Sequence, residues 1–433
     1  MKTTTWILPE KSGKRFRMGH PWVFANELAE SPKGLQPGAP VELRTSRGQL
    51  LARGYGNPHS LICFRTLSRR EGELEPWSHK RLSDKVASAW HWRKLLGLTS
   101  FSHRLIFGEA DELPGLVMDR FVTREGDRQI LVMQILTAGM ELHLPQPAAW
   151  VASWVESVTG LKPEQTQLVV RRDVGARKLE GLQMIPPQVF ALHQPESETT
   201  LPQENFPAWI RGSDNRDGNA SGGVIFYLDL IGGQKTGFFF DQASNLELLV
   251  KSIPPQTSGT VRILDLFCYV GQWGTQLARI FKNAGAQPEV HLVDGSAAAL
   301  ALAQKNAGQF SKAVYAHERD ILEGLSAIPD CEIVICDPPA FIKSKKDHGP
   351  GLRGYLKANT LAMEKVKSGG FFVSCSCSHH LSDMDMVDVL RQAEAKAGRK
   401  IRWLGRGVQA PDHPIRLNFP EGQYLKAWVG RVE

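Results

Sequence analysis

The stretch Val261-Arg262-Ile263-Leu264-Asp265-Leu266-Phe267-Cys268-Tyr269-Val270-Gly271-Gln272-Trp273-Gly274 decides the fold. Its first seven residues form an apolar run that predicts a buried strand, and Gln272 to Asn283 has the spacing of a helix. Gly271 lies in the turn between them. A strand that passes through a glycine-bearing turn into a helix is typical of a sheet that binds a ligand at the carboxyl ends of its strands.

The same alternation of strand and helix continues from about residue 223 to the end of the chain. Further strands are predicted at Val290–Asp294, Ala313–Ala316, Glu332–Cys336 and Phe371–Ser376. Helices are predicted at Ser296–Ala307, with Ser296 as N-cap, at Leu352–Val366, and from the capping box Ser382–Asp385 to Ala397. This alternation predicts an α/β doubly wound, mostly parallel sheet.

Two late strands, Lys400–Leu404 and Tyr424–Val429, have no helix between them. They are expected to form an antiparallel edge. Such an ending is typical of a class I methyltransferase sheet and distinguishes it from an all-parallel Rossmann domain.

Three segments precede this region. Short apolar stretches broken by Gly and Pro predict a small β-rich domain over residues 1–72, and mixed strand and helix patterns predict a central α+β domain over residues 73–192. One helix carrying Trp150 and Trp154 is expected there. Residues 193–222 are rich in Gln, Ser, Glu, Pro, Asn and Gly and are interpreted as a linker or insertion, so the last domain spans residues 223–433.

Composition and charge narrow the class of protein. The hydrophobic fraction is 42% of 433 residues, with no apolar run long enough to span a bilayer and no signal-like start, so a cytoplasmic protein without membrane contact is expected. Residues 1–70 hold twelve basic against four acidic residues, whereas the net charge of the whole chain is +7. This concentration favours a phosphate-binding surface over a merely solvated basic face.

The chain has six cysteines and no Cys-x-x-Cys pair, so no tetrahedral zinc site and no metal are expected. Free thiols are expected instead. Cys331 and Cys336 flank an apolar run and are interpreted as plain buried residues.

The turn after the first strand of the last domain favours S-adenosylmethionine as cofactor. Gly271 and Gly274 form a Gly-x-x-Gly, not the Gly-x-Gly-x-x-Gly that brings a backbone against a pyrophosphate. S-adenosylmethionine has no pyrophosphate, whereas NAD has one. Asp294 ends the second strand and is expected to accept hydrogen bonds from the ribose hydroxyls, and Asp320, after the third strand, from the adenine amine.

A second constellation predicts the chemistry. Asp337-Pro338-Pro339-Ala340-Phe341 follows the fourth strand of the last domain, and its prolines hold Asp337 in a fixed pose, either to bond a base edge or only to cap the turn. Cys377 lies at the mouth of the next strand, before a capped helix whose N-terminus favours a thiolate. Cytosine C5 becomes nucleophilic once a thiolate adds to C6, which is the chemistry that such a cysteine supplies. Cys375 is the rival nucleophile, and Cys377 is preferred because it lies nearer the open strand end.

Several further motifs carry a family resemblance. They are His20-Pro21-Trp22-Val23-Phe24, Gly108 to Leu116, Gly233 to Gln242, Asp265 to Gly271, Ser376-Cys377-Ser378, Asp412-His413-Pro414 and Tyr424-Leu425-Lys426. With these motifs the chain resembles, over nearly its whole length, the PUA-containing family of bacterial large-subunit (23S) ribosomal RNA cytosine-C5 methyltransferases. The resemblance implies an RNA-binding PUA domain at the N-terminus, a SAM-dependent methyltransferase domain and a homodimer.

The resemblance also implies roles for single residues. Cys377 is the expected nucleophile, and Lys235, Phe239 and Gln242 are expected beside the cofactor. The motif residues Asp265, Phe267, Tyr269 and Gly271 are expected to bind the cofactor. Asp337 is expected both to take part in catalysis and to contact the cofactor. Two features depart from the pattern. Residues 193–222 look like an insertion. Related RNA cytosine-C5 methyltransferases outside the family carry a second cysteine where this chain has Pro339, so adduct release is expected to use another base, Asp337 or a water.

Three alternatives stay open at the level of sequence. A guanine-N7 methyltransferase would use the Asp-Pro-Pro turn without a catalytic thiol. A non-catalytic RNA-binding protein would need neither, although the acids at 265, 294, 320 and 337 argue against it. An NAD-dependent oxidoreductase is disfavoured by the missing third glycine.

Overall fold

The computed structural model describes residues 3–201, 204–213, 222–254 and 256–433. The chain divides into two compact units. Unit 1 comprises residues 1–209, 229–237 and 412–422, and unit 2 comprises residues 210–228, 238–411 and 423–433. In the described part of the chain no helix is long and apolar enough to cross a membrane.

Unit 1 contains two five-stranded sheets. The first has the order β1-β3-β4-β5-β2, with β1 (Thr4–Ile7), β2 (Trp22–Phe24), β3 (Pro40–Arg44), β4 (Leu50–Gly56) and β5 (Ile62–Ser68), and the short helix α1 (Lys14–Arg17). Its core is small and includes Leu8, Phe16, Val41 and Phe64. This is the β-rich region that the sequence predicts for residues 1–72.

The second sheet of unit 1 has the order β10-β9-β8-β7-β6. Its strands are β6 (His103–Phe107), β7 (Leu116–Val122), β8 (Gln129–Ile135), β9 (Thr166–Arg172) and β10 (Ile185–Ala191). The helices of this region are α2 (His79–Leu95), α3 (Ala138–His143), α4 (Pro147–Ala152) and α5 (Val155–Thr159). The single helix predicted around Trp150 and Trp154 is therefore wrong: the chain breaks at Trp154, and the two indoles meet edge to face, with ring centroids 5.6 Å apart.

Unit 2 is built on a sheet of the order β15-β14-β13-β16-β17-β19-β18. Its strands are β13 (Thr260–Leu266), β14 (Gln287–Asp294), β15 (Ala313–Glu318), β16 (Cys331–Cys336), β17 (Val366–Ser376), β18 (Ile401–Gly407) and β19 (Lys426–Val432). The first five are parallel, and β19 runs antiparallel to both β17 and β18. The predicted antiparallel ending is confirmed.

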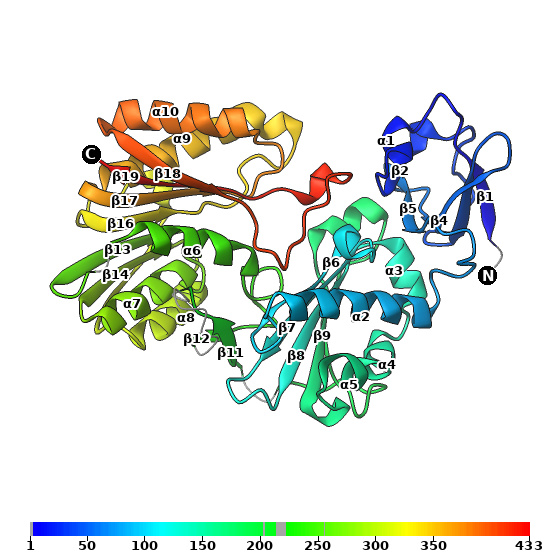
Figure 1. Ribbon diagram of the computed structural model, residues 1–433, viewed down its shortest axis with the longest axis horizontal. Helices are drawn as coiled ribbons and strands as arrows, with labels where there is room; N and C mark the ends of the chain where they lie inside the picture. Colours follow the sequence, from blue (N-terminus) through cyan, green and yellow to red (C-terminus); the bar gives the residue numbers. More distant parts are fainter. Residues whose placement is uncertain (1–2, 202–203, 214–221, 255) are drawn as a thin grey trace. The chain divides into compact units, whose positions relative to one another are not determined.

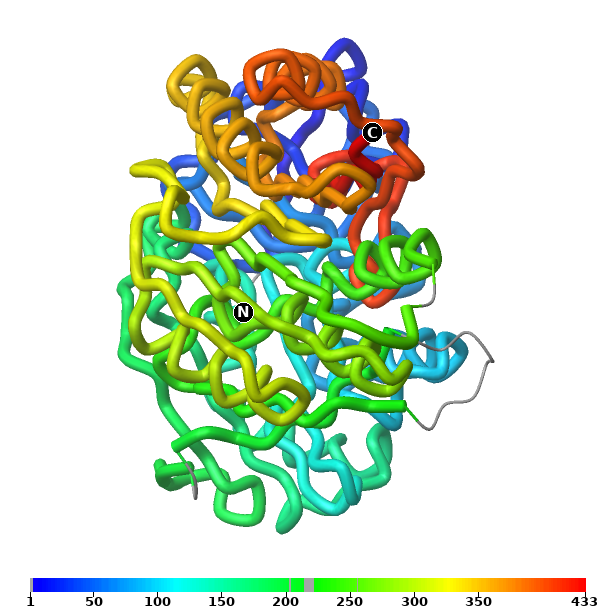
Figure 2. Tube along the Cα trace, turned by 90° about the vertical axis from the view of Figure 1, so that its left-hand side faces the viewer, coloured from blue at the N-terminus to red at the C-terminus, as the bar shows by residue number. Residues whose placement is uncertain are grey.

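Helices cover both faces of this sheet (Figure 1). Alternate strand residues point to opposite faces, so Ile263 packs with α6 (Ala243–Ser252), α7 (Gln272–Ala284) and α8 (Ala297–Gly308), whereas Leu264 packs with α9 (His348–Glu364) and α10 (Asp383–Ala397). The gold and orange traces of α9 and α10 run side by side in Figure 1 and in Figure 2. The predicted caps of α8 at Ser296 and of α10 at Ser382 are both confirmed.

The segment interpreted as a linker or insertion, residues 193–222, contains regular structure. Strand β11 (Phe206–Arg211) lies within it and forms a two-stranded sheet with β12 (Gly223–Leu228). The linker interpretation is thus wrong for residues 206–211, where Phe206, Ala208 and Ile210 are buried at alternate positions. Residues 202–203 and 214–221 of the predicted insertion lie outside the described residues.

Two segments of the predicted domain 223–433 belong to unit 1, which corrects that boundary. In segment 412–422, Asp412 is buried: its carbonyl accepts a bond of 2.6 Å from Arg93 and its carboxylate one of 2.9 Å from the amide of Arg104. In segment 229–237, the Gly233 carbonyl accepts a bond of 3.1 Å from Arg171. Buried polar groups need such partners, and these segments find them in unit 1.

Candidate active site

The loop that follows β13 carries three residues with positive φ. Phe267 has φ 60°, Tyr269 has φ 49° and Gly271 has φ 76°. Non-glycine residues rarely adopt this conformation, and such outliers cluster at functional sites. At Gly271 the positive φ favours glycine, and the space is tight as well, because a Cβ atom would come within 3.1 Å of Ala303 on α8.

Asp265, at the end of β13, is fully buried and only half satisfied. Its Oδ2 accepts a hydrogen bond of 2.9 Å from the amide of Gly274 at the start of α7, and its Oδ1 has no partner within the described residues. Burial raises the pKa of Asp265 well above its usual value, and the charges of Asp337 and Asp294 add to this effect. A buried carboxylate with one oxygen that accepts no hydrogen bond fits a cationic ligand.

The two acids that end the next strands differ in exposure. Asp294 accepts bonds of 2.9 Å from the amides of Tyr269 and Ser296, so it fixes the loop after β13 while its carboxylate stays partly exposed. Asp320 is exposed, and its Oδ1 accepts a bond of 2.9 Å from the amide of Leu322. Both follow carboxyl ends of neighbouring strands, because the sheet order places β15 beside β14 and β14 beside β13.

Asp337 is held by two side chains from different helices. Its Oδ2 accepts a bond of 2.7 Å from the amide nitrogen of Gln242 and one of 3.4 Å from the indole of Trp273. Asn245 in turn donates to the Gln242 oxygen over 2.7 Å. The Asp337 carboxylate thus contacts both Gln242 and Trp273.

The remaining predicted cofactor residues divide between the units. The rings of Phe239 and Tyr269 lie 5.1 Å apart in unit 2. Phe267 faces Phe341, from the Asp-Pro-Pro turn, at 6.3 Å. Lys235 belongs to unit 1, with φ 52°, so its place beside the cofactor stays a prediction.

The two candidate nucleophiles differ in accessibility. Strand β17 ends at Ser376, so Cys377 lies just beyond it and is partly exposed, whereas the other five cysteines are buried. Cys375 packs in the core with Val373 and Val429, and burial raises the pKa of its thiol well above the usual value. A neutral, enclosed thiol is a poor nucleophile, which favours Cys377.

A hydroxyl network holds the two residues that flank Cys377. The Ser376 hydroxyl donates to the Tyr355 hydroxyl over 2.9 Å, and the Tyr355 and Ser378 hydroxyl oxygens lie 2.8 Å apart. The Ser378 oxygen also accepts a bond of 3.1 Å from the amide of Ile342, which follows the Asp-Pro-Pro turn. Helix α9 therefore ties the cysteine loop to the turn after β16 through Tyr355.

A cation reaches the same loop from β19. The Lys426 ammonium donates to the Ser378 carbonyl over 3.3 Å. Burial lowers the pKa of Lys426, an effect that Asp383 and Cys377 oppose. An ammonium beside the loop favours the thiolate form of Cys377.

Four of these residues have no role assigned at the level of sequence: Asn245, Trp273, Tyr355 and Lys426. Trp273 and Tyr355 lie inside predicted helices, and nothing in their local pattern separates a site residue from a core residue. Lys426 belongs to a motif that carries the family resemblance, which is the one signal that points to it.

Two family models match the chain. A PUA-like domain matches residues 7–69, and a methyltransferase small domain matches residues 238–394. Two solved structures share the fold. One is described as a SAM-dependent methyltransferase from Streptococcus mutans, with TM-score 0.71, 14% identity and coverage of 99% of this chain and 100% of that one. The other is described as a methyltransferase complexed with SAH, with TM-score 0.72, 15% identity and full coverage of both chains.

The fold and these matches define the chain as a SAM-dependent methyltransferase with a PUA-like domain at its N-terminus. The predicted fold class and the predicted cofactor, S-adenosylmethionine, are confirmed. Curated relatives are more specific. "Ribosomal RNA large subunit methyltransferase I" of Photobacterium profundum is 31% identical over the full length of both chains, and its namesake in Shewanella denitrificans is 30% identical over 95% of each. The chain belongs to this family.

Proposed function

We propose that this enzyme methylates C5 of a cytosine in large-subunit ribosomal RNA, with Cys377 as covalent nucleophile. The observation that carries the proposal is the placement of Cys377, which is partly exposed at the carboxyl end of β17 and flanked by two serines bonded to Tyr355. A methyltransferase of an exocyclic amine or of guanine N7 has no use for a thiol held in this way.

The residues around the loop after β13 fit S-adenosylmethionine. The unpartnered Oδ1 of buried Asp265 suits the methionine ammonium, and partly exposed Asp294 suits the ribose hydroxyls. Phe239 and Tyr269 offer ring faces, and Asp320 a carboxylate for the adenine amine. When bound, S-adenosylmethionine supplies an electrophilic methyl group.

The chain's own groups prepare the base. The Cys377 thiolate adds to C6 of the cytosine, which pushes electron density onto C5. The adjacent Lys426 ammonium stabilises the thiolate, and the Tyr355 network fixes its loop. After methylation a base removes the C5 proton, and the thiolate leaves C6 as the ring double bond re-forms.

Asp337 is the residue that we assign to the base edge. Gln242 and Trp273 hold its carboxylate in place, and a carboxylate oxygen is an acceptor that suits the exocyclic amine of cytosine. Because Pro339 occupies the position of a second cysteine, the C5 proton goes to Asp337 or to a water.

Ribosomal RNA as substrate rests on the family and on the PUA-like domain. This substrate implies that the enzyme works in the bacterial cytoplasm, where ribosomes assemble.

The test is methyl transfer from labelled S-adenosylmethionine to undermethylated ribosomal RNA, with the modified nucleotide identified by mass spectrometry. Cys377→Ala is expected to abolish 5-methylcytosine, whereas Cys375→Ala, the matched control, keeps at least half of the activity. Full activity of Cys377→Ala, or 7-methylguanosine as the product of the wild-type enzyme, would overturn the proposal.

A further inference from the structure

Part of the positive charge of residues 1–70 is neutralised inside unit 1. Carboxylates within 4 Å neutralise five of the eight arginines of this segment: Arg15, Arg44, Arg47, Arg53 and Arg65. Two others, Arg17 and Arg69, donate to backbone carbonyls. Five of the twelve basic residues of this segment therefore have a carboxylate partner, so that only part of its positive charge is available to a phosphate.

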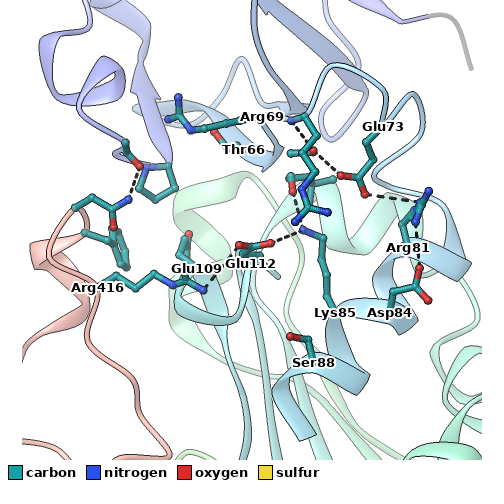
Figure 3. A pocket seen from close by; sticks show the side chains of 17 residues that line it. Thr66, Arg69, Glu73, Arg81, Asp84, Lys85, Ser88, Glu109, Glu112 and Arg416 are labelled. Atoms are coloured by element: carbon teal, nitrogen blue, oxygen red, sulfur yellow. Dashed lines mark hydrogen bonds and ion pairs between the residues drawn. The ribbon is translucent and has the colours of Figure 1, made fainter. Parts of the chain in front are cut away.

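A cavity of unit 1 shows the same partial neutralisation. Figure 3 shows Arg81 between Glu73 and Asp84, at 3.8 and 3.4 Å, and Lys85 beside Glu112 at 3.1 Å. Arg416 also approaches Glu112, at 3.9 Å. Each of these three cations has a carboxylate within 4 Å, whereas Arg69 and Arg70, which also line the cavity, make no ion pair within the described residues.

In contrast, the segment from the Asp-Pro-Pro turn into α9 carries cations without partners. Lys343, Lys345, Lys346, Arg353 and Lys357 are exposed, and none makes a side-chain hydrogen bond or ion pair within the described residues. Between residues 340 and 360 the only acid is Asp347, which accepts a bond of 2.8 Å from the Ser344 hydroxyl. This segment therefore has an excess of four positive charges.

The segment is directly attached to the cysteine loop. Ile342 precedes Lys343 and donates its amide to the Ser378 oxygen over 3.1 Å. The Phe341 ring meets Tyr355 edge to face at 4.9 Å and packs against the position of Gly354, where a Cβ would lie 3.1 Å from it. The buried side of α9 thus supports the site, and the opposite, solvent-exposed side carries Arg353 and Lys357, which are neighbours at i and i+4.

We infer that Lys343, Lys345, Lys346, Arg353 and Lys357 form a binding surface for the RNA phosphates that flank the target nucleotide. This inference rests on the proposed RNA substrate. A cytosine can reach Cys377 only when it is taken out of its stack, so the backbone on either side must be held next to the cysteine loop. Unpaired lysines and arginines are the groups that do this, because each neutralised phosphate releases counterions.

The magnitude follows from counterion release. Each contact to single-stranded RNA contributes about 0.7 to the slope of log affinity against log salt concentration. Four lost contacts would lower that slope by about 3 and weaken binding at moderate salt by roughly 10- to 200-fold.

The experiment compares two variants of the full chain with equal loss of charge. The first is K343Q/K345Q/K346Q/K357Q. The control is K251Q/K312Q/K396Q/K400Q, which neutralises four other exposed lysines of unit 2 that make no side-chain pair in the described residues. Binding to in vitro transcribed large-subunit ribosomal RNA is measured across a salt series, without turnover, and thermal unfolding checks that both variants fold.

The first variant is expected to lower the salt slope by about 3 and to raise the KM for RNA, while the affinity for S-adenosylmethionine and the kcat at saturating RNA change less than twofold. The control is expected to shift binding less than threefold. Equal effects of the two variants, or no change of slope in the first, would overturn the inference. The binding measurement does not depend on methyl transfer. If the wild-type enzyme made no 5-methylcytosine, the proposed function would be contradicted, but the two variants could still be compared for RNA binding.

Discussion

The buried carboxylate of Asp265 should make the enzyme less stable in the absence of its cofactor, and Asp265→Asn tests this directly. The asparagine side chain keeps an uncharged oxygen that accepts from the Gly274 amide. Its NH₂ group takes the position of the unpartnered Oδ1. The substitution therefore removes a buried charge without removing the hydrogen bond that closes the turn.

The sign of the effect follows from the raised pKa of Asp265. Above about pH 4 the unfolded carboxyl ionises freely, whereas the folded one resists ionisation, so the folded state without cofactor loses stability as the pH rises. Asparagine has no such dependence. Each unit of pKa difference corresponds to about 1.4 kcal/mol, and with one empty bonding position we expect the variant to gain about 1–3 kcal/mol at pH 8 and less at pH 5.

The assay is differential scanning calorimetry with and without S-adenosylmethionine, together with calorimetric titration of the cofactor. Without cofactor, the Asp265→Asn transition should rise by roughly 2–10 °C at pH 8. Its affinity for the cofactor should fall by about 10- to 100-fold, because a charge-assisted bond contributes about 1.5–3 kcal/mol. Asp320→Asn, at an exposed position, is the control and should leave the transition unchanged. A lower transition temperature for Asp265→Asn without cofactor, or unchanged affinity, would refute the reasoning.

Three further substitutions probe the site. Tyr355→Phe removes the hydroxyl shared by the serines beside Cys377. It should lower the free energy of unfolding, measured with denaturant, by about 1–3 kcal/mol and the kcat of methyl transfer at least tenfold. A kcat within twofold of wild type would exclude a positioning role. Lys426→Met should shift the pH midpoint of Cys377 alkylation by iodoacetamide upward by about one unit, and Lys426→Arg should restore it; identical midpoints would exclude the ammonium as a thiolate stabiliser. Gly271→Ala forces a Cβ towards Ala303 at positive φ and should weaken cofactor binding by tenfold or more in titration calorimetry, so that unchanged binding would contradict the need for glycine.

The local pattern was enough to predict most elements of unit 2. Apolar runs and caps are local features, so strands such as β13 and β16 and the caps at Ser296 and Ser382 follow from the residues themselves. Order along the chain also carries information about the site, because side chains that follow parallel strands collect at one edge of the sheet. For this reason the sequence predicts that Asp294 and Asp337 lie at one edge of the sheet, and the strand order confirms this placement.

Other features depend on partners far along the chain. The excess of basic residues in 1–70 predicts a phosphate surface only if the arginines are free, and Arg65 instead pairs with Glu109 and Glu180 at 2.7 and 3.0 Å. Residues 412–422 follow a methyltransferase strand in sequence, yet the buried bonds of Asp412 to Arg93 and Arg104 place them in unit 1. Neither outcome can be predicted from a short stretch of sequence, because the partners lie far away along the chain.

By itself, the sequence of this protein determined a class I methyltransferase sheet, the glycine turn at Gly271 between strand and helix, and a cysteine at the end of a strand. The tertiary structure decided which thiol is accessible, since Cys375 packs in the core and Cys377 emerges beyond β17. It also decided that Asp265 keeps one oxygen unpartnered and that Tyr355 bonds the serines beside Cys377. Composition and spacing set which elements form, but burial and hydrogen-bond partners arise only when distant segments pack together, and these set the reactivity of each group.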